Sequence, residues 1–201
     1  MKRLPIILLF LCAAAGFLSA QADEYPDGET VSDFDYLSIR KGDQFIKLGL
    51  GVNIPLLMQG PDGAGRAKNM YVGGVGCLGY HYYITPGFSL GGDINFQFNV
   101  TTAGNVLFKL PILIKPAWTF TLGRIHIPVS LGLGATFESY DSRNYFNVSV
   151  QPEVGAYYIF NPEWSFGLAV SWDVIPQWYK DSSNNRIGHF LNTCISLRYH
   201  F

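Results

Sequence analysis

Apolar and polar residues alternate with a period of two along most of the chain after Asp43. The clearest segment is 88–100, where one face is almost entirely apolar and the other is polar or glycine. The apolar face holds Phe88, Leu90, Gly92, Ile94, Phe96, Phe98 and Val100, and the other face holds Ser89, Gly91, Asp93, Asn95, Gln97 and Asn99. Segments 44–56 and 125–137 repeat this alternation. Such a pattern predicts β-strands with two unlike faces.

The same pattern, followed to the end of the chain, predicts eight strands. They span roughly 44–56, 71–83, 88–100, 106–120, 125–138, 146–159, 164–174 and 189–201. Each is long enough to cross a tilted bilayer path of about 9–11 residues, whereas strands of soluble proteins are more often about 5–6 residues long. The predicted fold is all-β: an eight-stranded antiparallel up-and-down transmembrane β-barrel.

The connections between these strands alternate in character. Those after the second, fourth and sixth strands are tight and carry turn residues, at 85–87, 122–124 and 161–163. Those after the first and seventh strands are longer and polar, near 57–70 and 175–188. Short turns at one rim and longer loops at the other are typical of outer-membrane barrels.

Composition separates this barrel from a soluble β-sandwich, which also alternates. The polar strand faces carry mostly Gly, Ser, Asn and Gln rather than the Lys and Glu of a water-facing surface. Charged residues make up only 14% of the chain, below the roughly 25% of soluble domains. Small neutral side chains suit the crowded interior of an eight-stranded barrel. With a formal net charge of −1 and no basic cluster, the chain gives no indication of nucleic-acid binding.

The beginning of the chain predicts export. Lys2 and Arg3 precede an apolar stretch from Leu4 to Ala20, and small residues follow, so we expect a signal peptide at 1–22 with cleavage before Asp23. Segment 23–42 is rich in acids and is expected to be a solvated periplasmic segment, followed by the barrel at 43–201. The expected location is the outer membrane of a diderm bacterium.

The last strand carries a family resemblance. Ile195, Leu197, Tyr199 and Phe201 share one face, and the aromatic-x-Phe ending resembles the signal that outer-membrane barrels present to their assembly machinery. Residues 43–201 resemble the small eight-stranded family that includes OmpW, OmpX, the opacity proteins and the membrane domain of OmpA. The resemblance implies Tyr199 and Phe201 as the assembly signal, and outer-membrane lipid, periplasmic chaperones and the barrel assembly machinery as partners.

Several charged residues fall on the inward face of the predicted strands. They are Lys47, Asp93, Lys109, Lys115, Glu153, Asp173 and Arg198. In a narrow lumen such charges must pair or stay hydrated, because an isolated charge in a low dielectric is costly. Lys115 and Glu153 should flank Ser130 on the inner wall, and we expect them to form an ion pair that serves as a structural plug or lies on a solute path.

No catalytic, cofactor or metal site is expected. His126 and Ser130 share a face but lie four residues apart, about 13 Å at 3.3 Å per residue, which is too far for a nucleophile and its base. The same spacing separates Ser196 from His200, while cross-strand partners stay open.

The cysteines of the predicted barrel are not expected to form a disulfide. Cys77 and Cys194 fall on the second and eighth strands, about 9–10 Å apart if these flank the first strand, beyond the limit of about 7 Å for bridging. We expect Cys77 to face lipid and Cys194 to face the lumen.

The last long loop holds exposed candidates for contact. Ile175, Trp178 and Tyr179 could line the upper rim or grip a lipid or a host surface partner. Three functions stay open. Resemblance to OmpW implies a narrow channel or lateral route for small hydrophobic molecules; the alternative is a non-transporting structural or surface-interaction barrel; the least favoured is a lipid-modifying enzyme.

Overall fold

The computed structural model describes residues 38–201 except 61, 64, 67–68, 142 and 179–184. The expected signal peptide and residues 23–37 of the acidic segment lie outside the described residues. The strands are β1 (Gln44–Gln59), β2 (Gly65–Arg66), β3 (Gly73–Thr85), β4 (Phe88–Val100), β5 (Val106–Leu122), β6 (Ile125–Tyr140), β7 (Arg143–Ile159), β8 (Trp164–Gln177) and β9 (Arg186–His200). The two-residue β2 pairs with the end of β1, inside the connection that the sequence pattern leaves as a loop.

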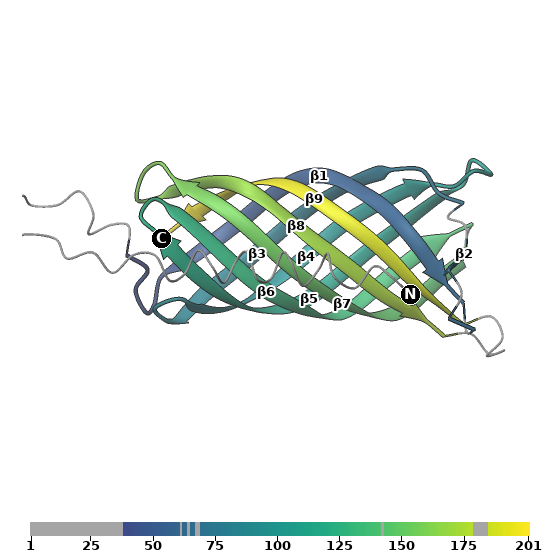
Figure 1. The fold of residues 1–201 in the computed structure, drawn as a ribbon, viewed down its shortest axis with the longest axis horizontal. Coiled ribbons are helices and arrows are strands. Elements are labelled where there is room, and N and C mark those ends of the chain that lie inside the picture. Colours follow the sequence, from purple (N-terminus) through teal and green to yellow (C-terminus); the bar gives the residue numbers. More distant parts are fainter. Residues whose placement is uncertain (1–37, 61, 64, 67–68, 142, 179–184) are drawn as a thin grey trace, which may run out of the picture. The chain divides into compact units, whose positions relative to one another are not determined.

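The eight long strands close into a barrel. Each is antiparallel to its sequence neighbour, from β1–β3 through β8–β9, and β1 also pairs with β9 over most of their lengths. Figure 1 shows β1 and β9 lying side by side at this seam. Closure leaves no long strand with an unpaired edge among the described residues, which a spanning sheet requires because lipid offers no hydrogen bonds. The predicted fold class is confirmed.

The turns gather at one end of the barrel, where β9 also ends (Figure 1). Gly87 and Gly123 occupy these turns with φ of 92° and 57°, values that glycine adopts without strain. At the same end Gly42, with φ of 100°, lets the chain enter β1, and its amide donates to Tyr83 O at 2.9 Å. We call this the turn end, and the opposite end, with the longer connections, the loop end.

The two strand faces separate as the alternation predicts. Outward residues are apolar and exposed, for example Leu50 at 76% and Ile114 at 65%, and they form a continuous belt around the barrel. Inward residues are polar and buried, including Asn53, Gln97 and Thr136, each with no exposed surface. An apolar exterior around a polar interior is the reverse of a water-soluble protein and fits immersion in lipid.

One predicted orientation is wrong. Cys77 was expected to face lipid, but it lies on the inward face of β3 with Val75 and Gly79, and it lines the interior together with Cys194. The error arises because β3 begins and ends in glycine- and aromatic-rich sequence whose two faces are less unlike than those of β4. Both thiols are free, and their strands flank β1.

Candidate functional site: the barrel interior

Four charged side chains from four strands meet inside the barrel. Lys47 of β1 and Lys115 of β5 each place Nζ 2.7 Å from Asp93 Oδ2 on β4. The same two ammonium groups contact Glu153 of β7, at 3.2 Å from Oε1 and 2.9 Å from Oε2. His81 of β3 adds a contact of 3.0 Å between its Nε2 and Asp93 Oδ1. We call Lys47, Asp93, Lys115 and Glu153 the central cluster; its charges balance, as buried ions require.

A set of amides extends this cluster toward β8 and β9. Asp173 of β8 accepts hydrogen bonds from Gln97 Nε2 at 2.6 Å and Asn192 Nδ2 at 2.9 Å, and it also accepts one from Gln151. Gln151 in turn accepts a hydrogen bond from Lys115 Nζ at 2.8 Å. The Asp173 carboxylate is therefore buried with no cation of the described residues in direct contact, and hydrogen bonds from amide side chains hold it in place.

The centre of the lumen is filled by these side chains. The free space bounded by Lys47, Cys77, Asn95, Gln151 and Glu153 amounts to about 10 Å³. A cavity needs about 10–15 Å³ to hold a single water molecule. The interior is therefore closed to a hydrated ion or a small solute at this level.

A larger cavity opens at the loop end. It has a volume of about 590 Å³ and is lined by residues of β1, β5, β6, β7, β8 and β9 and of the connections 69–70 and 101–103. Beneath it Leu107, Ile175 and Phe190 form an apolar cluster with Met70 and Tyr140 packed against it. Glu138 of β6 lines the cavity while being only 2% exposed.

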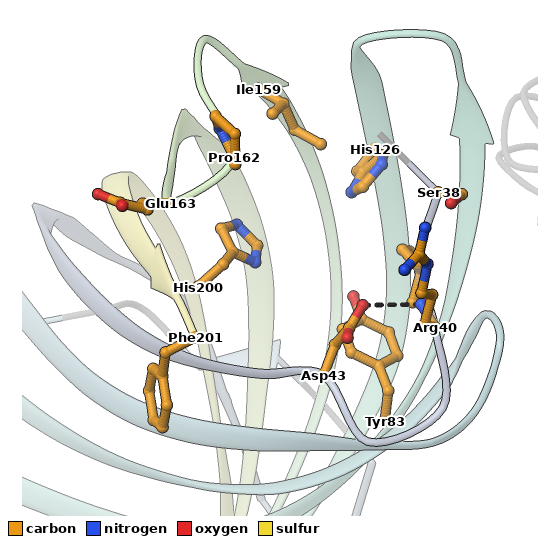
Figure 2. A pocket seen from close by; sticks show the side chains of 11 residues that line it. Ser38, Arg40, Asp43, Tyr83, His126, Ile159, Pro162, Glu163, His200 and Phe201 are labelled. Carbon is orange, nitrogen blue, oxygen red and sulfur yellow. Dashed lines mark hydrogen bonds between the residues drawn. The ribbon is translucent and has the colours of Figure 1, made fainter. Parts of the chain in front are cut away.

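A second cavity, of about 570 Å³, opens at the turn end (Figure 2). Figure 2 shows His126, His200 and Asp43 approaching it from different elements, with the Arg40 backbone N–H donating to Asp43 Oδ2 at 2.7 Å. The wall between this cavity and the central cluster includes Arg198, whose guanidinium lies between aromatic rings, 4.5 Å from that of Phe45 and 3.3 Å from that of Tyr157.

A serine and a histidine do meet across two strands. Ser165 Oγ lies 2.9 Å from His200 Nε2, a cross-strand contact that spacing along one strand could not reveal. Ser165 is only 1% exposed, however, and among the described residues no carboxylate hydrogen-bonds the His200 ring. The described residues also hold no group of three or more His, Cys, Asp or Glu arranged to bind a metal. No helix in the described part of the chain is long and apolar enough to span a membrane.

The structure brings together one predicted pair of site residues and moves another predicted residue away from its expected position. Lys115 and Glu153 are brought together, with Ser130 directly opposite Glu153 in the β6–β7 pairing. Ile175 was expected in the loop rim, and this is wrong: β8 continues to Gln177, where it pairs with Arg186, so Ile175 lies within the strand and its side chain is fully buried.

The remaining candidates lie on the outside or beyond the described residues. Trp178 follows β8 directly and is 63% exposed, while Tyr179 lies outside the described residues. Tyr199 and Phe201 are exposed at the turn end with their rings stacked at a centroid distance of 5.9 Å. Their role as an assembly signal stays a prediction.

Sequence reasoning placed Lys47, Asp93 and Lys109 inward but did not say what they meet. Lys47 and Asp93 lie on β1 and β4, and both pair with Gly79 of β3, so their side chains meet over a residue that has none. Glu138 was missed altogether, although it shares the inward parity of Gly134 and Thr136. The alternation along β6 could therefore have identified Glu138 as an inward-facing residue.

Comparisons with known proteins agree with this architecture. A protein-family model matches residues 23–199. An uncharacterized protein of Treponema pallidum (strain Nichols) is 32% identical over 206 residues, covering 95% of this chain and 94% of that protein. An uncharacterized protein of Borreliella burgdorferi (strain ATCC 35210) is 25% identical over 172 residues, covering 75% of this chain and 79% of that protein.

Solved structures share the fold at low sequence identity. Outer membrane protein OprG from Pseudomonas aeruginosa matches with a TM-score of 0.54 and 14% identity, over 83% of this chain and 99% of that one. Neisserial surface protein A matches with a TM-score of 0.56 and 11% identity, over 80% and 98%. The Escherichia coli outer membrane protein W matches with a TM-score of 0.52 and 16% identity, over 81% and 99%.

Proposed function

We propose a function from the premise that the chain belongs to the family of its Treponema pallidum relative, a family of small eight-stranded outer-membrane β-barrels. In this proposal the protein is an integral outer-membrane barrel that does not conduct along its axis. It acts instead as a binding protein at its loop end, where the cavity of about 590 Å³ is open to a small molecule.

The filled centre of the lumen carries this proposal. The central cluster and the amides around Asp173 leave about 10 Å³ of free space between the cavities at the two ends. To open a path, Lys47 and Lys115 would have to leave Asp93 and Glu153, which costs several kcal/mol for buried ions that lose their partners. A cavity of a few hundred Å³ with few polar groups is, by contrast, a typical small-molecule site.

Lateral passage of small apolar molecules into the bilayer is a second candidate, and one observation favours it. The β1–β3 ladder ends at Asn53–Gly73, and beyond that point the loop-end cavity is lined by Met58 on one side and by Asn69 and Met70 on the other. A molecule held in the cavity therefore lies within reach of this part of the wall. The buried position of Ile175 removes one of the residues first considered for this route.

Flux measurements test the proposal. The purified barrel, refolded into liposomes and planar bilayers, should show no steady ion conductance and no uptake of small charged solutes, while a porin in the same lipids shows both. Steady single-channel conductance would contradict the non-conducting role. Uptake of small apolar solutes without ion conductance would instead support the lateral candidate.

We also propose that the protein has no catalytic activity. Two observations support this: Ser165 lines neither of the end cavities, and among the described residues no carboxylate hydrogen-bonds the His200 ring to orient it as a base. Release of fatty acid from phospholipid vesicles by the native barrel, lost in Ser165→Ala, would overturn this part of the proposal.

A further inference from the structure

Glu138 has a buried carboxylate in which one oxygen accepts hydrogen bonds and the other accepts none from the described residues. Its Oε2 accepts hydrogen bonds from Asn147 Nδ2 at 2.9 Å and from Gln177 Nε2 at 2.8 Å. Its Oε1 is buried and has no hydrogen-bond partner in the structure. Two amides from different strands therefore fix the orientation of this carboxylate, and the remaining oxygen has unused acceptor capacity, which is costly inside a protein unless a donor arrives.

The neighbouring lysine does not meet this need. Lys109 lies directly opposite Glu138 in the β5–β6 pairing, yet its Nζ sits 3.0 Å from the centroid of the Phe190 ring and has no hydrogen-bond partner among the residues that the structure describes. The ammonium is thus engaged by an aromatic face rather than by the carboxylate. Among the described residues of the loop half, two buried carboxylates, those of Glu138 and Asp173, accompany one buried ammonium, that of Lys109, so negative charge is in excess there.

We propose that Glu138 binds the ammonium or guanidinium group of a small organic cation in the loop-end cavity. This inference rests on the proposed loop-end binding function and names its ligand class. The charged donor hydrogen-bonds Glu138 Oε1, and the apolar body of the ligand occupies the cavity above. A charge-assisted hydrogen bond of this kind is roughly twice as strong as a neutral one.

The rest of the lining fits such a ligand. Tyr140 and Tyr145 contribute aromatic rings to the lining, a residue type that attracts cations, and Met58, Met70 and Leu107 contribute adaptable apolar surface. The volume of about 590 Å³ lies within the usual range for small-molecule sites, about 300–1,000 Å³. Arg186, at the start of β9, also lines the cavity but is exposed, so it stands at the mouth rather than beside Glu138.

Calorimetric titration of the full barrel in dodecyl maltoside, a non-ionic detergent, tests the site. The probes are 2-phenylethylammonium, the neutral 2-phenylethanol and the anionic 3-phenylpropionate, which share a ring and differ in charge. The native barrel should bind the ammonium at least about tenfold more tightly than the alcohol, since a hydrogen bond to a charged group contributes about 1.5–3 kcal/mol. Equal binding of the three probes, or no binding of the ammonium, overturns the proposal without any variant.

Glu138→Gln is the matched variant, because its amide oxygen can still accept from Asn147 and Gln177 while its NH₂ replaces the free oxygen. It should lose the preference for the ammonium over the alcohol, whereas Glu163→Gln at the turn end should keep it. Arg186→Gln should bind the ammonium as well as the native chain or better. Unchanged ammonium binding in Glu138→Gln, or tight phenylpropionate binding that Arg186→Gln abolishes, overturns the proposal.

The two proposals fail separately. Ion conductance with selective ammonium binding would contradict the non-conducting role and leave the Glu138 site standing. A barrel that neither conducts ions nor binds the ammonium would support the non-conducting role and contradict the Glu138 site.

Discussion

Two groups of buried charges occupy the same lumen, and they differ in how fully they are partnered. In the central cluster each ammonium contacts two carboxylates, and Asp93 receives three of the contacts. In the loop half, Lys109 Nζ and Glu138 Oε1 both lack a hydrogen-bond partner in the described part of the chain, although these side chains are as deeply buried as those of the central cluster. The first group is complete without any ligand and suits a structural plug. The second group has charged atoms without hydrogen-bond partners, and this difference supports the loop end as the proposed binding site.

Asp93→Asn should have the largest effect on this comparison. It leaves Lys47 and Lys115 with Glu153 as their one remaining carboxylate, and breaking a buried ion pair costs about 3–5 kcal/mol. Urea unfolding in detergent, followed by tryptophan fluorescence, measures the loss.

Asp141→Asn is the control for Asp93→Asn, because Asp141 is exposed in a loop-end turn at φ of 48°, which asparagine tolerates. Equal stability of the two variants would mean that the central cluster does not hold the barrel together.

Glu153→Gln and Glu138→Gln compare the two groups directly. Glu153→Gln loses the charge-assisted hydrogen bonds to Lys47 and Lys115, and we expect this to lower the free energy of unfolding by roughly 1.5–3 kcal/mol. Glu138 keeps both amide donors and loses only an unpartnered oxygen, so its variant should cost less than about 1 kcal/mol. The same urea titration measures the free energy of unfolding of both variants. A larger loss in Glu138→Gln than in Glu153→Gln would contradict the distinction between a structural central cluster and a binding site at the loop end.

Gly49→Ala tests how tightly the centre is packed. A methyl group at Gly49 would come within 2.5 Å of Cys77 Sγ and 2.6 Å of Ser196 Oγ, so both side chains must move. Overpacking of this size should destabilise the barrel by about 1–2 kcal/mol.

Gly76→Ala is the control for Gly49→Ala, because its methyl would meet only ordinary contacts, the nearest being Leu50 Cδ2 at 3.6 Å. If Gly49→Ala is as stable as Gly76→Ala, the centre of the lumen has more room than its side chains indicate.

The smallest expected effect concerns the thiols. Cys77 and Cys194 both line the central space and their thiols contact each other, but β3 and β9 lie on opposite sides of β1, and two strand spacings would amount to about 9–10 Å between backbones. Disulfides need Cα atoms within about 7 Å. Mass spectrometry of the unreduced barrel should therefore find two free thiols, and an intramolecular bridge would mean that the backbones of β3 and β9 come closer here than two strand spacings.

The parts of the structure that follow from local pattern were predictable from the sequence. Strand positions and inward faces follow from alternation, and Lys115–Glu153 could be anticipated because β5, β6 and β7 are consecutive hairpin strands. The Lys47–Asp93 contact depends on the registers of β1, β3 and β4, which place Gly79 between the two residues and which no single strand encodes. Ile175 was misplaced because Pro176 resembles the end of a strand, whereas here it pairs with Ile187.

The origin of the central cluster also bears on how the barrel is put together. Its members come from β1, β4, β5 and β7, and His81 from β3 completes its contacts. A curved sheet running from β1 to β7 thus already contains every ion that crosses the lumen at this level. Its two free edges are those that the β8–β9 hairpin joins, through β7–β8 and β1–β9. The hairpin can therefore act as the closing element of assembly, added to a sheet whose curvature the interior ions have set.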